Sequence, residues 1–400
     1  MEEVIQQMLD NQSDKGSMQT RATTKSESVH VPLIQEVSSE IPDTTSKVSS
    51  EDFQSKLLSD YQRELEERKQ EELKFENQFK NTNIRSYETE KIMCLAVDGH
   101  ETSDNAFNII IKEFIDRLNT TLMCVHIYNN VHNEEYNWKH QKLHIMEKYN
   151  TNLITHLTEE KGHLVVQDRN PSYRHPIEQV ARIAVKNECN FLCLGFQGLK
   201  TQNFKMTNIR LGVDYLLRES KMPTIIFKEK FCRGIKNKGY KWLIVMDRAS
   251  SDCFKVFDFF YPLMDIKKDE IHGLTLLPKY VKFDDIKKQF HEKMKEINID
   301  EEQIHYEMLP YVARPSEIVK PYVNKNDDNY YDFVIFYNNP DQYRAQGVES
   351  ENLKMVEKLQ ANICFVNGVY MNMVKLEMEK EEQRRREEEE ERKKKEKEEQ

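Results

Sequence analysis

Short apolar segments alternate with helix-forming segments along most of this chain, and that alternation restricts the fold more than any other feature of the sequence. Between residues 91 and 228, apolar runs of strand length are separated by segments whose apolar residues recur at helical spacing. Strands joined by helices pair in parallel, through right-handed crossovers that place helices on both faces of the sheet. The predicted strands are 92–98, 121–128, 163–168, 190–195 and 223–228.

The same alternation begins again after a break at 230–239, which is rich in glycine and lysine and is predicted to be a linker. The second series of predicted strands is 242–247, 270–278, 303–309, 332–338 and 362–368. We therefore predict an α/β protein with two five-stranded parallel-sheet units, 88–229 and 240–368. Ser103 is the predicted N-cap of the first helix.

Both ends of the chain differ in composition from these two units. Residues 1–50 are rich in Ser, Thr, Glu and Gln without sustained periodicity, which predicts disorder. Residues 51–85 contain no Gly or Pro and favour a helical extension. The tail 369–400 is mostly charged, with Glu and Arg or Lys about four residues apart, a spacing that supports an exposed helix.

Charge and composition argue against two classes of protein. The net charge is −10, from 59 Lys and Arg against 69 Asp and Glu, whereas general nucleic-acid binding relies on a basic surface. No apolar run reaches 18 residues and no signal-peptide pattern is present, so the sequence predicts a cytoplasmic protein without a membrane partner. The 7 cysteines show no CxxC spacing and are expected to be buried free thiols.

Candidate ligand-binding residues of the first unit follow from strand order, because ligands of parallel α/β sheets bind at the carboxyl ends of the strands. Asp98 ends the first strand, and Gly195 and Gly198 follow the fourth, where glycine lets the backbone approach a ligand. Ile127 ends the second strand and could form an apolar wall for a base. Gly212 and Val213 open or lie within the next helix, whose free amides could bind an anion.

These residues resemble the universal stress protein family. The resemblance rests on "CLAVDGHETSDNAF", "LMCVHIY", "NFLCLGFQG" and "LGVDYLLRESKMPTIIF", and it covers the whole first unit. It implies an adenine nucleotide alpha hydrolase-like fold, a dimer and ATP or AMP as the ligand. By the family's motif, the nucleotide-contacting positions are Asp98, Ile127, Gly195, Gly198, Gly212 and Val213.

The sequence departs from the family's motif in two ways. Thirteen residues, 199–211, separate Gly198 from Gly212 where the family has nine, and Val213 replaces the hydroxyl residue that would contact phosphate. Lys200, Lys205 and Arg210 in this loop could supply positive charge instead. The alternative is structural: Asp98 caps a turn, and the glycines only turn the chain.

The second unit keeps the signals of the fold and lacks those of the site. Asp247 occupies the place of Asp98, but Arg248 follows it, and no G-x2-G follows the fourth strand. Pro340 removes an N–H and fixes φ where a phosphate loop needs freedom and donors. We therefore expect a degenerate universal stress protein-like unit with a packing or partner role.

The functional expectation is a non-enzymatic protein that binds adenine nucleotide in its first unit and has a regulatory or scaffolding role. Strands 223–228 and 362–367 could pair within the chain, which would make an internal pseudo-dimer. The alternative is a nucleotide-free scaffold whose helical extensions dock onto a cytoskeletal or ciliary assembly. A slow ATP hydrolase is a weaker option. His140 and His144 have helical metal-ligand spacing but no evident third ligand, so no metal site is expected.

Overall fold

A computed structural model describes residue 63 and residues 91–115, 120–130, 138–173, 175–196, 207–228, 238–247, 251–277, 283–310, 315–324, 331–338 and 351–398. The predicted disordered segment 1–50 lies outside these residues. So does the extension 51–85, apart from Arg63, which is helical, and so does most of the linker 230–239.

The first half of the described chain has its strands in the order β3-β2-β1-β4-β5, and all are parallel. The strands are β1 (Lys91–Ala96), β2 (Thr120–Tyr128), β3 (Gly162–Asp168), β4 (Phe191–Gly195) and β5 (Thr224–Phe227). The helices between them are α3 (Glu101–Ile109), α5 (Lys142–His156), α6 (Pro176–Lys186) and α7 (Thr207–Glu219). α5 and α6 lie within the predicted helical segments 138–160 and 175–187, whereas α3 and α7 begin before the predicted starts at 103 and 208. Apolar residues at helical spacing mark the face that is buried against the sheet and not the first residue of the helix.

The second half repeats this order as β8-β7-β6-β9-β10, again in parallel. The strands are β6 (Lys241–Asp247), β7 (Glu270–Leu277), β8 (Ile304–Pro310), β9 (Phe333–Asn338) and β10 (Asn362–Asn367). The helices are α9 (Ser251–Phe260), α10 (Phe283–Glu296), α11 (Pro315–Val323), α13 (Glu351–Lys358) and α14 (Gly368–Glu398).

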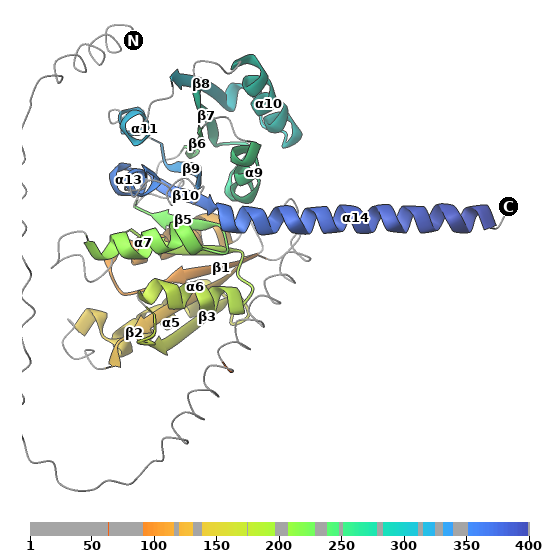
Figure 1. The fold of residues 1–400 in the computed structure, drawn as a ribbon. Helices are drawn as coiled ribbons and strands as arrows, with labels where there is room; N and C mark the ends of the chain where they lie inside the picture. Colours follow the sequence, from red (N-terminus) through yellow and green to blue (C-terminus); the bar gives the residue numbers. More distant parts are fainter. Residues whose placement is uncertain are drawn as a thin grey trace, which may run out of the picture. The chain divides into compact units, whose positions relative to one another are not determined.

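The two series of strands form one ten-stranded sheet instead of two separate sheets, because β5 and β10 pair with each other (Figure 1). This pair is antiparallel, with Ile226 opposite Ile363 and Ile225 opposite Cys364. The strand pairing predicted for 223–228 and 362–367 is therefore present. All four side chains are fully buried, so the seam lies in the core of the sheet.

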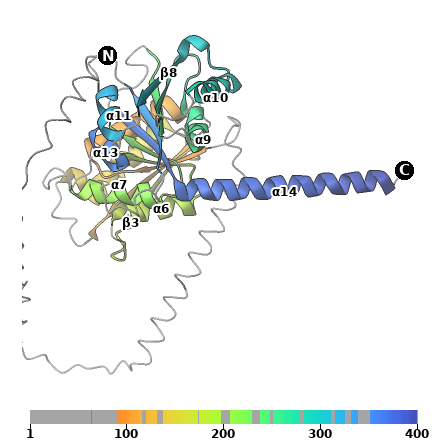
Figure 2. The same ribbon diagram turned by 45° about the horizontal axis from the view of Figure 1, so that its top comes forward.

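Helices cover both faces of this sheet. On one face α6, α7, α13 and α11 lie in a row that continues from the first half into the second, whereas α9 and α10 cover the other face of the second half (Figure 2). The contact between α7 and α13 crosses the seam. The two halves therefore share a helical layer as well as a strand pair.

Polar contacts reinforce the seam in a nearly symmetrical way. Directly after β5, the Lys228 ammonium donates to the carbonyl oxygens of Val356 and, at 2.7 Å, of Leu359, at the end of α13. At the end of β10, the Asn367 side chain donates to the carbonyl of Leu216 in the last turns of α7 (3.4 Å). The last carbonyls of a helix have no partner within the helix, and Lys228 supplies one to the end of α13. The Leu216 carbonyl also accepts the Ser220 N–H at 3.1 Å, so Asn367 adds a second donor at the end of α7.

A buried carboxylate organises the start of the second half. Trp242 is fully buried and stacks on Phe333, with 4.1 Å between ring centroids. Its indole nitrogen donates to Asp269 (2.9 Å), which also accepts the backbone N–H groups of Tyr240 and Asp265, both at 2.9 Å. Asp269 is only 1% exposed, and these three donors compensate its burial.

The final helix, α14, is far longer than the others. Its 31 residues correspond to about 46 Å at 1.5 Å per residue. It begins directly after β10 (Figure 1), with Met371 fully buried, whereas residues 383–388 are all exposed. The charged tail predicted for 369–400 is thus helical over its described part. Among the described residues, no helix is both long and apolar enough to cross a membrane.

Candidate functional site

The strand order of the first half creates a topological switch point between β1 and β4. β1 pairs with β2 on one side and with β4 on the other. The connection that follows β1 leads to β2 and the connection that follows β4 leads to β5, so the two run in opposite directions across the sheet. Ligands of open α/β sheets bind in the crevice at such a point, outside the carboxyl ends of the strands. Asp98 lies two residues beyond β1 and Gly195 ends β4, so the structure brings these two predicted residues to the same edge of the sheet.

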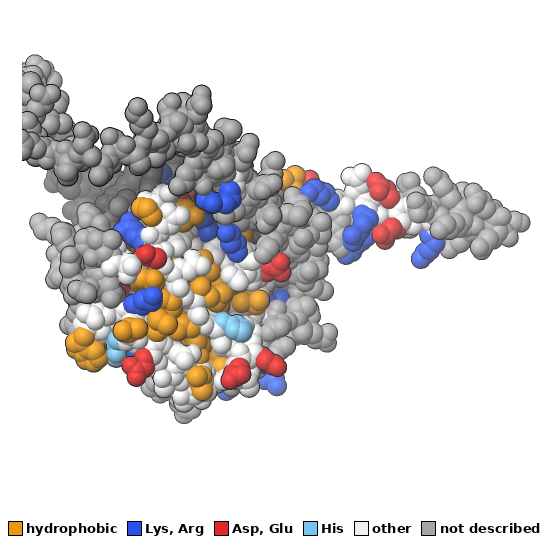
Figure 3. All heavy atoms as spheres, turned by 90° about the horizontal axis from the view of Figure 1, so that it is seen from below, with side chains coloured by type: hydrophobic (Ala, Val, Ile, Leu, Met, Phe, Trp, Pro, Cys, Tyr) orange, Lys and Arg blue, Asp and Glu red, His pale blue; other side chains and the backbone are white. Residues whose placement is uncertain are grey.

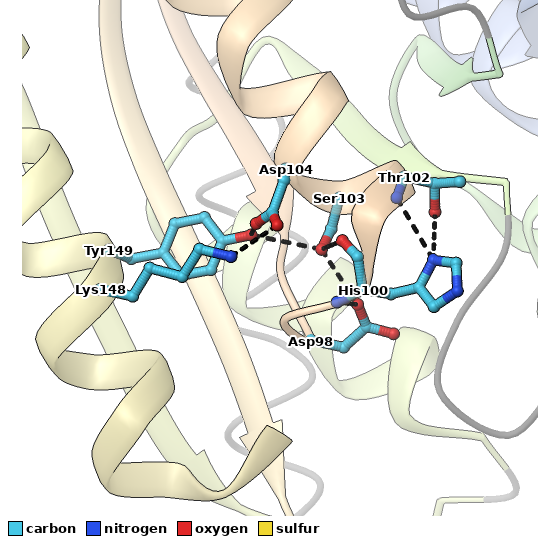
Figure 4. A network of polar contacts seen from close by, with 7 residues as sticks. All are labelled: Asp98, His100, Thr102, Ser103, Asp104, Lys148 and Tyr149. Carbon is cyan, nitrogen blue, oxygen red and sulfur yellow. Dashed lines mark hydrogen bonds and ion pairs between the residues drawn. The ribbon is translucent and has the colours of Figure 1, made fainter. Parts of the chain in front are cut away.

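Asp98 organises the turn between β1 and α3 (Figure 4). Its Oδ1 accepts from the backbone N–H of His100 and from the Ser103 hydroxyl, both at 3.0 Å. Gly99 between them has a φ of +78°, a left-handed conformation that glycine adopts without strain. The turn-capping role that the sequence left as an alternative for Asp98 is therefore present.

The first helix is capped differently from the prediction. Its N-cap is His100, whose Nδ1 accepts from Thr102 N at 3.2 Å, and Ser103 lies in the first turn. The prediction of Ser103 as N-cap was wrong because α3 begins at Glu101, so Ser103 already lies within its first turn. The single hydroxyl proton of Ser103 is shared between Asp98 Oδ1 (3.0 Å) and the His100 carbonyl (2.8 Å). The amides of Ser103 and Asp104 donate to that same carbonyl. These three first-turn amides thus already have partners within the protein.

A second group of polar side chains ties α3 to α5 (Figure 4). The Tyr149 hydroxyl donates to Asp104 (2.8 Å) and lies 3.2 Å from the Ser103 hydroxyl. Lys148 pairs with the other carboxylate oxygen of Asp104 at 2.5 Å. Burial, followed by the charge of Asp104, holds the pKa of Tyr149 well above its ordinary value. Sequence reasoning missed this network, because only the packing of α5 brings Lys148 and Tyr149 to the start of α3.

Gly195 is required by the close approach of β4 to the start of α3. A Cβ at this position would lie 2.6 Å from the backbone carbon of Thr102 and 2.7 Å from the backbone nitrogen of Ser103. No alanine fits there without moving the helix. The glycine that the sequence assigns to ligand contact is thus explained by helix–strand packing, which by itself neither supports nor opposes a ligand.

The end of β2 adds a mixed apolar and basic wall next to Asp98. Ile127 is half-buried at this end. His126 is 4% exposed; its Nδ1 lies 2.8 Å from the Val97 carbonyl, and its Nε2 is buried without a hydrogen-bond partner. Burial lowers the pKa of His126, and Lys142 lowers it further. Lys142 itself lies over the ring of Tyr128, 4.0 Å from its centroid.

The remaining predicted contacts are placed less favourably. Gly198 and the loop that follows it lie outside the described residues. Gly212 and Val213 lie inside α7, where backbone amides bond within the helix and are not available to an anion. Val213 is 2% exposed, and a Cβ on Gly212 would lie 2.7 Å from the His175 ring. Their part in nucleotide binding stays a prediction that these packing roles do not support.

The matching edge of the second half is filled by asparagines. Asn338 ends β9, in the place that Gly195 has in β4, and is fully buried. Its side-chain amide donates to the Leu217 carbonyl of α7 and accepts from Asn352 at 2.6 Å. A polar side chain at this strand end therefore bonds to a helix of the other half, where the first half has a glycine. The side chain of Asp247 and residue Arg248 lie outside the described set.

The described cysteines lie away from this site. They are Cys94, Cys124, Cys189, Cys193 and Cys364, and all five are buried and outside any disulfide, as predicted for these positions. Burial raises the pKa of Cys124 and holds those of Cys94, Cys193 and Cys364 well above the ordinary range. Thiols in this state are poor nucleophiles.

Comparisons with known proteins add little to this geometry. No family model matches the sequence, and no curated protein matches it. Among solved structures, a functionally unknown protein from Pseudomonas aeruginosa is similar with a TM-score of 0.46 and 12% identity, over 73% of this chain and 98% of that one. The cytoplasmic domain of a prokaryotic cation chloride cotransporter is similar with a TM-score of 0.42 and 10% identity, over 72% of this chain and 100% of that one.

Proposed function

We propose that this chain is a non-enzymatic, universal stress protein-like binding protein whose two halves form an internal pseudo-dimer. The repeated order of strands and the antiparallel β5–β10 seam support this proposal. The reciprocal capping by Lys228 and Asn367 supports it further, because each residue serves the helix end of the opposite half. In this arrangement one chain supplies both members of a dimer.

The ligand of the first half, in this proposal, is an adenine nucleotide such as AMP or ATP, bound at the carboxyl ends of β1 and β4. The observation that carries this proposal is the switch point, which brings Asp98 and Gly195 to one edge of the sheet. Ile127 lies at the end of the neighbouring strand, and Lys142 supplies positive charge nearby. The proposal assigns no nucleotide to the second half, where Asn338 stands at the matching strand end and bonds to Leu217 of α7.

Isothermal titration of ATP and AMP into the full chain tests the nucleotide proposal. The expected result is saturable heat that is lost in Asp98→Ala. Asp98→Asn keeps an acceptor for the turn and removes the charge, so it separates capping from ligand contact. Asp168→Ala is the matched control, because Asp168 ends the edge strand β3 and also accepts nearby backbone N–H groups. The absence of heat at millimolar nucleotide would refute this part of the proposal and leave the pseudo-dimer standing.

A second candidate function is a nucleotide-free scaffold that docks onto a cytoskeletal or ciliary assembly. Two observations favour it. The first-turn amides of α3 already have partners, and α14 exposes charged residues along its described outer part (Figure 3). Deletion of residues 375–398 should then leave the unfolding midpoint unchanged and abolish co-sedimentation with polymerised microtubules. Equal co-sedimentation of the full and shortened chains would contradict this role for α14.

A further inference from the structure

Three metal-ligating side chains converge on the outer strands of the second half, far in the fold from the crevice between β1 and β4. Glu270 and His272 lie two residues apart on β7 and therefore point to the same face of the sheet. His305 lies directly opposite His272 on the edge strand β8. One ligand atom from each residue lies within 4.8 Å of the others. The two histidine rings are 4.4 Å apart between centroids.

Hydrogen bonding fixes which nitrogen of His272 faces this group. The Tyr331 hydroxyl donates to the hydroxyl of Tyr322 at 3.2 Å, so its oxygen accepts from Nδ1–H of His272, also at 3.2 Å. Glu307 follows as a hydrogen-bond partner of Tyr322. A neutral imidazole carries one proton, so Nε2 of His272 keeps its lone pair. Metal-binding histidines have this arrangement, in which the ring nitrogen that does not bind the metal donates its N–H to an oxygen.

The lone pair of His272 then faces a carboxylate without a proton between them. Its Nε2 lies 3.5 Å from Oε2 of Glu270, which is long for a hydrogen bond. Two ligands that share a tetrahedral zinc ion at bond lengths of about 2.0–2.1 Å lie roughly 3.3 Å apart. The observed separation is therefore close to that of two ligands on one ion.

A cation already lies beside this carboxylate. The Lys241 ammonium lies 3.3 Å from the same Oε2 of Glu270. A metal ion at this place would have to displace the ammonium, so Lys241 is expected to weaken metal binding.

We propose that Glu270, His272 and His305 bind a divalent transition-metal ion of the zinc class. Imidazole nitrogen and carboxylate oxygen are ligands that zinc prefers, and three protein ligands leave a coordination position open. His305 is exposed, so ions reach the site from solvent. Sequence reasoning missed this metal site because only the register of β7 and β8 brings His305 beside Glu270 and His272.

Titration of cobalt chloride into the untagged full chain, after dialysis against chelator, tests this proposal. We expect visible absorption bands of protein-bound Co²⁺ that saturate at one equivalent and disappear when zinc chloride is added. His305→Gln should weaken Co²⁺ binding by at least tenfold, and its exposure makes the variant safe for folding. His163→Gln, at an exposed histidine on the opposite edge strand, is the matched control and should leave affinity unchanged.

Two further variants address the surroundings of the ligands. Lys241→Gln should tighten Co²⁺ binding several-fold, because it removes the competing ammonium. Tyr331 is a positioning residue, so Tyr331→Phe should weaken binding about tenfold and shift the ring-nitrogen NMR signals of His272 toward the other tautomer. The absence of bands with millimolar Co²⁺, or wild-type affinity in a folded His305→Gln, would overturn the proposal.

Discussion

The substitution Gly195→Ala tests whether this glycine is required by packing, and its magnitude follows from the contact distances. The added Cβ would lie 2.6 Å from the backbone carbon of Thr102, whereas ordinary van der Waals contact begins at 3.4 Å. The start of α3 would therefore have to move by about 0.8 Å. Overpacking of this kind costs about 1–3 kcal/mol. The shift would also stretch the 3.0 Å contact from Ser103 to Asp98, so we expect the upper part of that range.

Urea unfolding followed by circular dichroism measures this effect, and Gly162→Ala is the matched control. Gly162 begins β3, and a Cβ there would meet only the flexible side chains of Leu153 and Leu157, all at 3.3 Å. We expect the control to remain within about 0.5 kcal/mol of the wild type, since alanine also reduces the entropy of the unfolded chain. Equal stability of Gly195→Ala and the control would refute the packing explanation.

Three further predictions concern buried polar groups. Asp269→Ala leaves three donors without their acceptor, at about 1–3 kcal/mol each, and should lower the unfolding free energy by several kcal/mol. Fluorescence of Trp242 in a Trp138→Phe background measures the unfolding. A loss under about 1 kcal/mol would contradict the stabilising role of Asp269. Lys228→Met keeps the aliphatic stem but loses the hydrogen bonds to the α13 carbonyls, so urea unfolding should show an unfolding free energy lower by about 1–2 kcal/mol. An unchanged unfolding free energy would show that the seam does not need these hydrogen bonds. Burial lowers the folded-state pKa of His126 below the unfolded value near 6.5, so the stability that neutral His126 contributes is present above that pH and is lost as pH falls through the folded pKa. Urea titrations at several pH values should show that the unfolding free energy declines more steeply with falling pH for the wild type than for His126→Asn. Parallel declines would contradict this.

Local sequence pattern predicted the elements of this fold well, because burial of apolar residues depends on spacing that can be read along the chain. The run "NFLCLG" became β4, and the helical segment 175–187 became α6, with Ile177, Val180, Ile183 and Ala184 all buried. The position of Asp98 after β1 was also predictable, since a strand that ends in Asp and Gly marks a turn. The N-cap was not predictable, because Ser103 and His100 are both able to cap and the choice depends on the residue at which the backbone becomes helical.

The sequence by itself determined the α/β class, the repeated series of strands and helices along the chain, and the strand ends at which a ligand was expected. Tertiary structure decided what those residues contact. Gly195 meets the backbone of α3, Val213 is buried, and Asn338 reaches across to α7; each depends on elements far away in the chain. The contact between His305 and His272 also depends on tertiary structure, because the register of β7 and β8 places them side by side. The packing of whole strands sets that register, so the residues next to either histidine in the sequence do not reveal it.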